Sequence, residues 1–379
     1  MDARVRHGPP GCQREAAVLG CPKFGAERLA PLPRRSKSVV NMPFIAPTGA
    51  ALQRTVPMGR GTRRTYGALD LGTNNCRLLI ARPGGEPGDI VIVDAFSRVV
   101  RLGEGLMQTG RLSDAAMDRA VAALGVCADK IARRGITLTR NVATEACRRA
   151  DNGIEFVARV FEVTGIALDV ISPAEEARLA VLGCASLIDP DGPPALVFDI
   201  GGGSTELILV DAATTAILAW TSVPWGVVSL AETELLDLPP AERAAAYARL
   251  QQRVKDHLGG FGERVTALAA GPLQLLGTSG TITTLASIAI GLPSYDRRRV
   301  DGCTVTVGAM REISAMLAAR SPVERAEVAG IGADRADLVV AGCALLEAIM
   351  DAWPGETIRV ADRGIREGIL RTLMSRPVR

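Results

Sequence analysis

The sequence contains very little histidine, and this scarcity narrows the chemistry that it can carry. His7 and His257 are the only two histidines among 379 residues, and aromatic residues make up 3% of the chain. A Ser-His-Asp triad or an H-E-x-x-H zinc site therefore has almost no side chains from which it could be built. Carboxylates must carry any acid–base chemistry.

Regular cysteine spacing and apolar runs of membrane length are also missing. The eight cysteines form no C-x-x-C pair, which argues against a zinc site or a disulfide framework and favours a reducing, cytoplasmic location. The longest uncharged stretch, residues 265–295, is rich in glycine, serine and threonine and contains two prolines. Because a membrane-spanning helix needs about 20 mostly apolar residues, no membrane partner is expected.

Charge is distributed unevenly along the chain. Residues 1–64 contain 12 of the 44 Lys and Arg residues but only 3 of the 41 Asp and Glu residues, and they show no apolar period. We expect them to form a disordered N-terminal extension. The remainder is mildly acidic, so a polyanionic ligand would have to be held by local arginines, backbone amides and a metal ion. No specific nucleic-acid partner is expected.

Beyond this extension the pattern is that of an α/β protein. An amphipathic segment at 113–134 predicts a helix, for which Ser113 is a suitable N-cap and Gly135 a suitable stop. Short apolar runs predict strands at 66–71, 76–81 and 90–96. Alternation of such runs with helical segments is typical of the α/β class.

The most informative feature is an internal repeat. Residues 68–80 and 197–209 both have the pattern of a strand, an Asp-x-Gly turn and a second strand, 129 residues apart. The two aspartates are Asp70 and Asp199. This duplication predicts two homologous halves, each opening with a β-hairpin, with the ligand between them.

Small residues fill the turn of each copy, and such turns are suited to phosphate. Consecutive backbone N–H groups can form an anion nest, and glycine permits close approach of a ligand. A third turn of this kind is the Gly-x-x-Gly turn of residues 277–280, which leads from a predicted strand beginning at Leu275 into a helix. An ordinary glycine-rich hairpin, or tight strand-to-helix packing in the third case, is the structural alternative. The candidate phosphate-binding residues are Gly72, Thr73, Asn74, Asn75, Gly201, Gly202, Gly203, Ser204, Thr205, Gly277, Ser279 and Gly280.

Asp70 and Asp199 are candidate metal ligands. Each ends an apolar strand, where aspartate is a poor strand former, and each lies beside a candidate phosphate loop. Mg²⁺ is bound in proteins by one or two carboxylates together with substrate oxygens, so both residues fit it. An Asx-turn that starts each hairpin is the structural alternative.

A helix beginning near Ser172 carries two consecutive glutamates. Ser172 as N-cap, Pro173 at the first helical position and Glu175 at the third form a capping-box pattern, so Glu175 is interpreted as structural. Glu176 points to another face and could activate a water if this helix end faces the cleft. A surface glutamate that compensates the helix dipole is the alternative.

Two further charged residues are candidates for the site. Glu206 follows the second small-residue turn in an otherwise apolar strand, which fits either a cleft residue or a solvated face. Arg148 could hold a phosphate with its planar fork, although a lone arginine on a helix is often a surface residue.

Taken together, these segments resemble the exopolyphosphatase/guanosine pentaphosphate phosphatase (Ppx/GppA) family. They occur in the family's order over essentially the whole chain after residue 64, and as a set they are highly specific. The matching segments are 70–75, 144–152, 172–178, 199–206, 225–229, 277–281 and 362–368.

The resemblance implies a duplicated actin-like (ribonuclease H-like) α/β fold with a Mg²⁺-dependent cleft between two domains. It implies that Glu176 is the general base, that Asp199 and Glu206 occupy acidic active-site positions, and that Arg148 binds phosphate. The expected domains are 65–191 and 192–363, with a C-terminal helix near 364–376 that packs back on the first.

Three functions remain open from the sequence. The first is an exopolyphosphatase that releases terminal orthophosphate from inorganic polyphosphate, and the second is a guanosine pentaphosphate 5′-phosphohydrolase. The third is a phosphate- or nucleotide-binding regulator or an actin-like kinase.

The sequence also departs from the family pattern. Asn75 stands where many relatives have serine, and the helical domains that longer relatives append are not found after the actin-like unit. A homodimer is among the expected assemblies.

Overall fold

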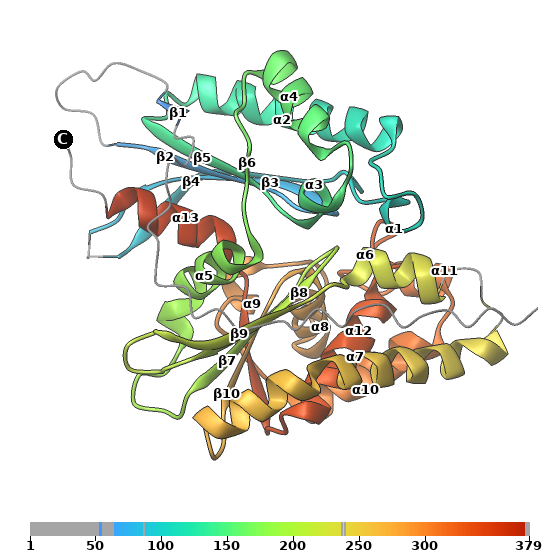
Figure 1. Ribbon diagram of the computed structural model, residues 1–379. Helices are drawn as coiled ribbons and strands as arrows, with labels where there is room; N and C mark the ends of the chain where they lie inside the picture. Colours follow the sequence, from blue (N-terminus) through green and yellow to red (C-terminus); the bar gives the residue numbers. More distant parts are fainter. Residues whose placement is uncertain (1–52, 55–63, 86–87, 236–237, 239, 376–379) are drawn as a thin grey trace, which may run out of the picture. The chain divides into compact units, whose positions relative to one another are not determined.

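The apolar runs of the first half form a six-stranded sheet in the computed structural model (Figure 1). The model describes residues 53–54, 64–85, 88–235, 238 and 240–375. Strands β2, β3 and β4 form an antiparallel meander, β5 pairs parallel with β2, and β6 pairs parallel with β5. The short β1 pairs antiparallel with the start of β5. The bounds are β1 Gln53–Arg54, β2 Tyr66–Leu71, β3 Asn75–Pro83, β4 Ile90–Val99, β5 Leu138–Ala143 and β6 Asp169–Val170.

Alternation along β2 divides the residues around this sheet into two cores. Leu69 and Leu71 belong to a core with residues of α2 and α4, whereas Tyr66 and Ala68 belong to a core with residues of α5 and α13. Successive side chains of a strand point to opposite faces, so one strand contributes to both layers. The helices in this half are α1 Leu106–Thr109, α2 Asp114–Arg133, α3 Glu145–Arg149, α4 Gly153–Thr164 and α5 Pro173–Cys184.

The second half builds a sheet of the same topology. Strands β7, β8 and β9 form an antiparallel meander, β10 pairs parallel with β7, and β12 pairs parallel with β10, with β11 added antiparallel at the edge. The bounds are β7 Ala195–Ile200, β8 Thr205–Val210, β9 Ile217–Val223, β10 Gln274–Thr278, β11 Thr304–Thr306 and β12 Thr357–Ala361. The repeat detected in the sequence is thus a repeat of fold, and the architecture is actin-like.

Helices surround the second sheet, and the last helix returns to the first one. In Figure 1 the red helix α13 lies beside the blue strands of the first sheet, and it contacts β2, β3 and β5. The helices are η1 Ala185–Leu187, α6 Val227–Leu230, the π-helix η2 Ala231–Leu235, α7 Pro240–Leu268, α8 Gly280–Ala289, α9 Arg297–Val300, α10 Val307–Ala319, α11 Pro322–Ala326, α12 Val339–Ala352 and α13 Ile365–Met374. None of the helices in the described part of the chain is both long and apolar enough to cross a membrane.

The strands predicted at 66–71, 76–81 and 90–96 and the helix predicted at 113–134 are confirmed. Helix α2 begins after Ser113, whose Oγ accepts a hydrogen bond from the Ala116 N–H, and the chain leaves the helix at Gly135 with a φ of 57°. The expected N-terminal extension lies outside the described residues, except for β1 and Arg64. The domain limits 65–191 and 192–363 remain a prediction, although each range contains the main strands of one sheet.

Helices α5 and α13 touch backbone to backbone. A Cβ built on Gly183 of α5 would lie 2.0 Å from the Gly364 carbonyl oxygen, and one built on Gly368 of α13 would lie 2.1 Å from the Leu179 carbonyl oxygen. No rotamer change can relieve a clash with backbone. These two glycines therefore allow the helix that leaves the first sheet to cross the helix that returns to it.

Substitution of Gly183 by alanine should strongly destabilise the protein. Overpacking of a tight contact typically costs about 1–3 kcal/mol and occasionally more, and we expect the upper end because backbone must move. The matched control is Gly125→Ala in α2, where an added Cβ meets nothing within 4 Å. There alanine should stabilise by up to about 1 kcal/mol. Chemical denaturation measures both, and equal midpoints for the two variants would contradict the packing argument.

Candidate active site

The two hairpin turns of the repeat have the same construction. In the first, Leu71 pairs with Cys76, and the Gly72 N–H donates to the Asn75 carbonyl oxygen at 2.9 Å. In the second, Ile200 pairs with Thr205, and the Gly201 N–H donates to the Ser204 carbonyl oxygen at 3.0 Å. Asp70 and Asp199 sit at matching positions, opposite Arg77 and Glu206 respectively. The duplication therefore extends to hydrogen bonds and register.

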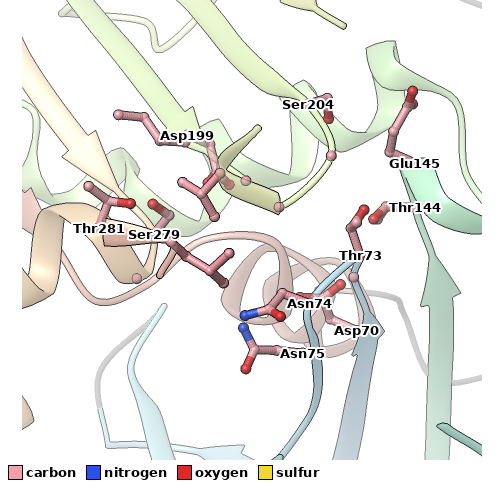
Figure 2. A pocket seen from close by; sticks show the side chains of 18 of the residues that line it. Asp70, Thr73, Asn74, Asn75, Thr144, Glu145, Asp199, Ser204, Ser279 and Thr281 are labelled. Atoms are coloured by element: carbon pink, nitrogen blue, oxygen red, sulfur yellow. The ribbon is translucent and has the colours of Figure 1, made fainter. Parts of the chain in front are cut away.

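The turns approach each other closely because glycine occupies the contact. A Cβ on Gly202 would lie 3.0 Å from Thr73 Cβ, and a Cβ on Gly203 would lie 2.6 Å from Thr73 Oγ1 and 3.0 Å from Glu145 Cγ. Figure 2 shows Thr73, Thr144 and Glu145 near the turn that carries Ser204. A side chain at Gly202 or Gly203 would push the two turns apart.

Neighbouring backbone holds the first turn in place. The N–H groups of Val100 and Arg101 both donate to the Asn74 carbonyl oxygen, and the Gly103 N–H donates to the Thr73 carbonyl oxygen. Arg101 also donates to Asp337, at 3.0 Å from Nη1 to Oδ2, so the same segment is tied to the chain that precedes α12. The turn is fixed by hydrogen bonds that do not depend on a ligand.

The third turn is strained at its first residue. Strand β10 ends at Thr278, and Ser279 adopts φ 97° before α8 begins at Gly280. Positive φ is costly for a residue other than glycine and is often found at functional sites. Ser279 Oγ is also buried without a hydrogen-bond partner within the described residues. In Figure 2 Ser279 and Thr281 lie close to Asp199.

All three turns line one cavity, which encloses about 940 Å³ of empty space including its open mouth. Most of the residues singled out from the sequence line it: Asp70, Gly72, Thr73, Asn74, Asn75, Glu176, Asp199, Gly201, Gly202, Gly203, Ser204, Glu206, Ser279 and Gly280. Folding thus brings together segments that are more than 200 residues apart.

Three candidates do not line the cavity. Thr205 lies in β8 and donates through Oγ1 to the Trp225 carbonyl oxygen at 3.0 Å. Gly277 lies within β10, where an added Cβ would come within 2.6 Å of the Phe198 ring, so tight packing explains this glycine. Arg148 is ion-paired to two carboxylates that do line the cavity, Glu145 and Glu176.

The two neighbouring glutamates at the start of α5 have different environments. Ser172 Oγ accepts from the Glu175 N–H at 3.2 Å, as expected for an N-cap. The second hydrogen bond of the predicted capping box, from the Ser172 N–H to the Glu175 carboxylate, is wrong. The Glu175 carboxylate instead accepts from Arg140 and Arg178, each at 2.7 Å. Glu175 is structural through these ion pairs. Glu176 faces the cavity and is 7% exposed.

Burial and mutual repulsion dominate the electrostatics of the cavity. Burial raises the pKa of Asp199 to about 6 and that of Glu206 to about 7, and it raises the pKa of Glu176 well above its usual value, with repulsion from Glu206 adding to the effect. Burial also raises the pKa of Asp70, although the nearby Arg77 opposes this. So many carboxylates around one space require a cation or protons.

A divalent cation fits part of this arrangement. Asp70 and Asp199 line the same cavity, and Asp70 Oδ1 is buried with no hydrogen-bond partner in the part of the chain that the structure describes. Among those residues, no group of three or more His, Cys, Asp or Glu side chains is arranged to hold a metal ion. Mg²⁺ does not need a cage made of protein alone, because it commonly takes one or two carboxylates plus water and substrate oxygens.

Sequence reasoning missed three charged residues that line the cavity, namely Arg77, Glu145 and Arg335. The repeat could have revealed Arg77, which stands opposite Asp70 as Glu206 stands opposite Asp199. Arg335 lies in an irregular segment before α12, and its Nη1 donates a hydrogen bond to Thr284 Oγ1 at 3.2 Å. No local pattern marks it.

A duplicated actin-like fold with opposed small-residue turns around buried carboxylates defines an enzyme that acts on phosphate groups. The model of the Ppx/GppA phosphatase family matches residues 81–376. The chain belongs to the Ppx/GppA phosphatase family and is a hydrolase of phosphoanhydride bonds. This membership removes the regulator and the actin-like kinase from the functions considered.

Relatives and solved structures agree with this assignment. The chain is 33% identical over 321 residues to Exopolyphosphatase 2 of Mycobacterium tuberculosis, covering 81% of this chain and 97% of the relative. It is 33% identical to Exopolyphosphatase 1 of Mycobacterium leprae, covering 82% and 89%. A crystal structure of the Aquifex aeolicus Ppx/GppA family member matches with 27% identity and a TM-score of 0.67, covering 82% and 97%. An exopolyphosphatase from Cytophaga hutchinsonii matches with 25% identity and a TM-score of 0.74, covering 82% and 98%.

Proposed function

We propose that this protein is an exopolyphosphatase, which removes the terminal orthophosphate from inorganic polyphosphate. The observation that carries the proposal is the meeting of two phosphate-suited turns and Glu176 in one cavity. The exopolyphosphatase names of the mycobacterial relatives support the same substrate. A cytoplasmic location and a homodimer remain predictions.

The reaction is an in-line displacement. The turn amides and Arg77 hold the terminal phosphoryl group, and Glu176 orients a water opposite the bridging oxygen. The water oxygen forms a bond to phosphorus as its proton passes to the Glu176 carboxylate. The bond between phosphorus and the bridging oxygen breaks, and its electron pair leaves with the shortened polyphosphate. Positioning and electrostatics supply most of the acceleration, as in other phosphoryl transfers.

Asp70 and Asp199 would hold Mg²⁺ beside this group. The ion supplies positive charge against the phosphate oxygens when it is bound. The residues themselves contribute acceptor oxygens at the ends of two equivalent strands, so each half of the repeat provides one ligand. Glu206 lies opposite Asp199 and accepts from Ser222 Oγ at 2.8 Å, which fixes one of its oxygens.

Guanosine pentaphosphate is the second candidate substrate, and one observation favours it. The part of the cavity contributed by the second half has apolar residues, Val227, Leu338 and Val339, beside the polar Thr284 and Arg335. A mixed surface of this kind suits a nucleoside better than a bare phosphate chain.

Phosphate release from three substrates tests the proposal directly. Short polyphosphate, long polyphosphate and guanosine pentaphosphate are compared at equal enzyme concentration with Mg²⁺ present. We expect kcat/KM to be highest for a polyphosphate. A higher value for guanosine pentaphosphate would make the nucleotide the substrate, and no release from any of them would refute both assignments.

Removal of Mg²⁺ should abolish hydrolysis without unfolding the protein, because two carboxylates alone do not hold the ion firmly in the absence of substrate. Excess EDTA is added, and both phosphate release and circular dichroism are recorded. Asp70→Asn should raise the Mg²⁺ concentration required for half-maximal rate. Full turnover in EDTA would remove the metal from the mechanism.

Replacement of Glu176 by glutamine should lower kcat by about 10²- to 10⁴-fold, because it removes the proton acceptor but keeps the size of the side chain. Glu155→Gln is the matched control, a first-turn glutamate of α4 whose side chain is 78% exposed. It should keep the wild-type rate.

Two further variants locate the base. Glu175→Gln weakens the ion pairs to Arg140 and Arg178, so we expect a lower melting temperature with kcat largely retained. If Glu176→Gln hydrolyses polyphosphate at the wild-type rate while Glu206→Gln does not, the base is Glu206.

A further inference from the structure

Most N–H groups of the Arg148 guanidinium already donate hydrogen bonds to other groups of the protein. Nε and Nη2 donate to Glu145 Oε2 at 3.1 and 2.7 Å, Nη2 donates to Glu176 Oε2 at 3.2 Å, and Nη1 donates to the Ile171 carbonyl oxygen at 2.6 Å. A guanidinium has five N–H groups, and these contacts use four of them. Arg148 is also absent from the cavity lining, whereas Glu145 and Glu176 belong to it.

We propose that Arg148 is a positioning residue that acts through Glu176, and that Glu145 sets the orientation of its guanidinium. This inference rests on the proposed function, in which Glu176 activates the water. It assigns Arg148 a role other than the phosphate binding implied by the family resemblance, and it gives a role to Glu145.

The geometry shows how the positioning works. Arg148 and Glu145 lie one turn apart on α3, and Ile171 precedes the N-cap of α5, on whose first turn Glu176 lies. The planar fork therefore joins α3 to the start of α5 at two points, Ile171 and Glu176, while Glu145 holds it from its own helix. A planar group with three partners has one orientation. It engages Oε2 of Glu176, which leaves Oε1 of that carboxylate to receive the proton of a water.

A phosphate in the cavity would compete with these carboxylates for the Arg148 guanidinium. Glu145 approaches the second turn so closely that a Cβ on Gly203 would lie 3.0 Å from Glu145 Cγ. To bind phosphate, the guanidinium would have to release charge-assisted hydrogen bonds to two carboxylates, which are among the stronger hydrogen bonds in proteins. Arg77 and Arg335 line the cavity and reach a ligand without that loss.

A double-mutant cycle on polyphosphate hydrolysis separates the two roles. Arg148→Gln should lower kcat by about 10- to 100-fold and change KM by less than about threefold, because only the base is misplaced. In the Glu176→Gln background the same change should cost less than about threefold, since residues that act as a unit are not additive. Equal losses in both backgrounds, or a rise of tenfold or more in KM, would overturn the proposal.

Binding of imidodiphosphate, a diphosphate analogue whose bridge resists hydrolysis, gives a readout independent of turnover. Calorimetry with Mg²⁺ present should give the same Kd for wild type and Arg148→Gln, and a Kd at least tenfold weaker would identify Arg148 as a phosphate ligand. This measurement remains decisive if no polyphosphate is hydrolysed, an outcome that sinks the proposed function alone. Wild-type kcat for Glu176→Gln would overturn the positioning role of Arg148 and leave polyphosphate as the substrate.

Conservative variants distinguish positioning from general loss of structure. Glu145→Gln retains an oxygen that can accept from Nε and Nη2, so it should lose less kcat than Glu145→Ala does, with KM unchanged in both. Arg149→Gln is the matched control, since Arg149 is next in sequence but comes no nearer than 3.8 Å to the Glu145 carboxylate. If Arg148→Gln does not fold, Arg148→Lys replaces it, and wild-type kcat in that variant would overturn the proposal because lysine has no fork.

Discussion

Close packing at a few glycines is the constraint on which this site depends. The two hairpin turns meet where Gly202 and Gly203 contact Thr73, and helices α5 and α13 meet backbone to backbone through Gly183 and Gly368. A phosphate group held by amides from both halves needs both turns within hydrogen-bond reach, and only glycine leaves that space. The shape of the cavity therefore depends on glycine at a few close contacts as much as on the side chains that line it.

Electrostatics adds a second requirement that the fold alone does not meet. Burial raises the pKa values of Asp70, Glu176, Asp199 and Glu206. Ionising these carboxylates inside the cavity therefore costs free energy. Arg77 offsets this next to the two aspartates. A divalent cation would add the positive charge that both the carboxylates and a polyanionic substrate require. A site of this kind is expected to bind metal and substrate together rather than either one alone.

Sequence reasoning located most of this site because the chemistry is repeated. Asp70 and Asp199 were found from one pattern that occurs twice, and the hairpins, the helix after Ser113 and the third turn followed from capping and small-residue signals. It did not find Glu145 or Arg335. Arg335 lies in a segment without a distinctive local pattern. Glu145 lies within the segment 144–152, which the sequence does mark, but only three-dimensional proximity shows that its side chain reaches the cavity.

The sequence by itself determined the α/β class, the duplication, the three turns and the acidic candidates, because these depend on periodicity and residue type within short segments. Tertiary structure decided which candidates share a cavity. It placed Gly277 in packing, it paired Arg148 with Glu145 and Glu176, and it directed Glu175 to Arg140 and Arg178 instead of its own helix cap. A side chain's hydrogen-bond partner is set by what folding brings within about 3 Å, and for each of these residues at least one contacting neighbour lies on another element.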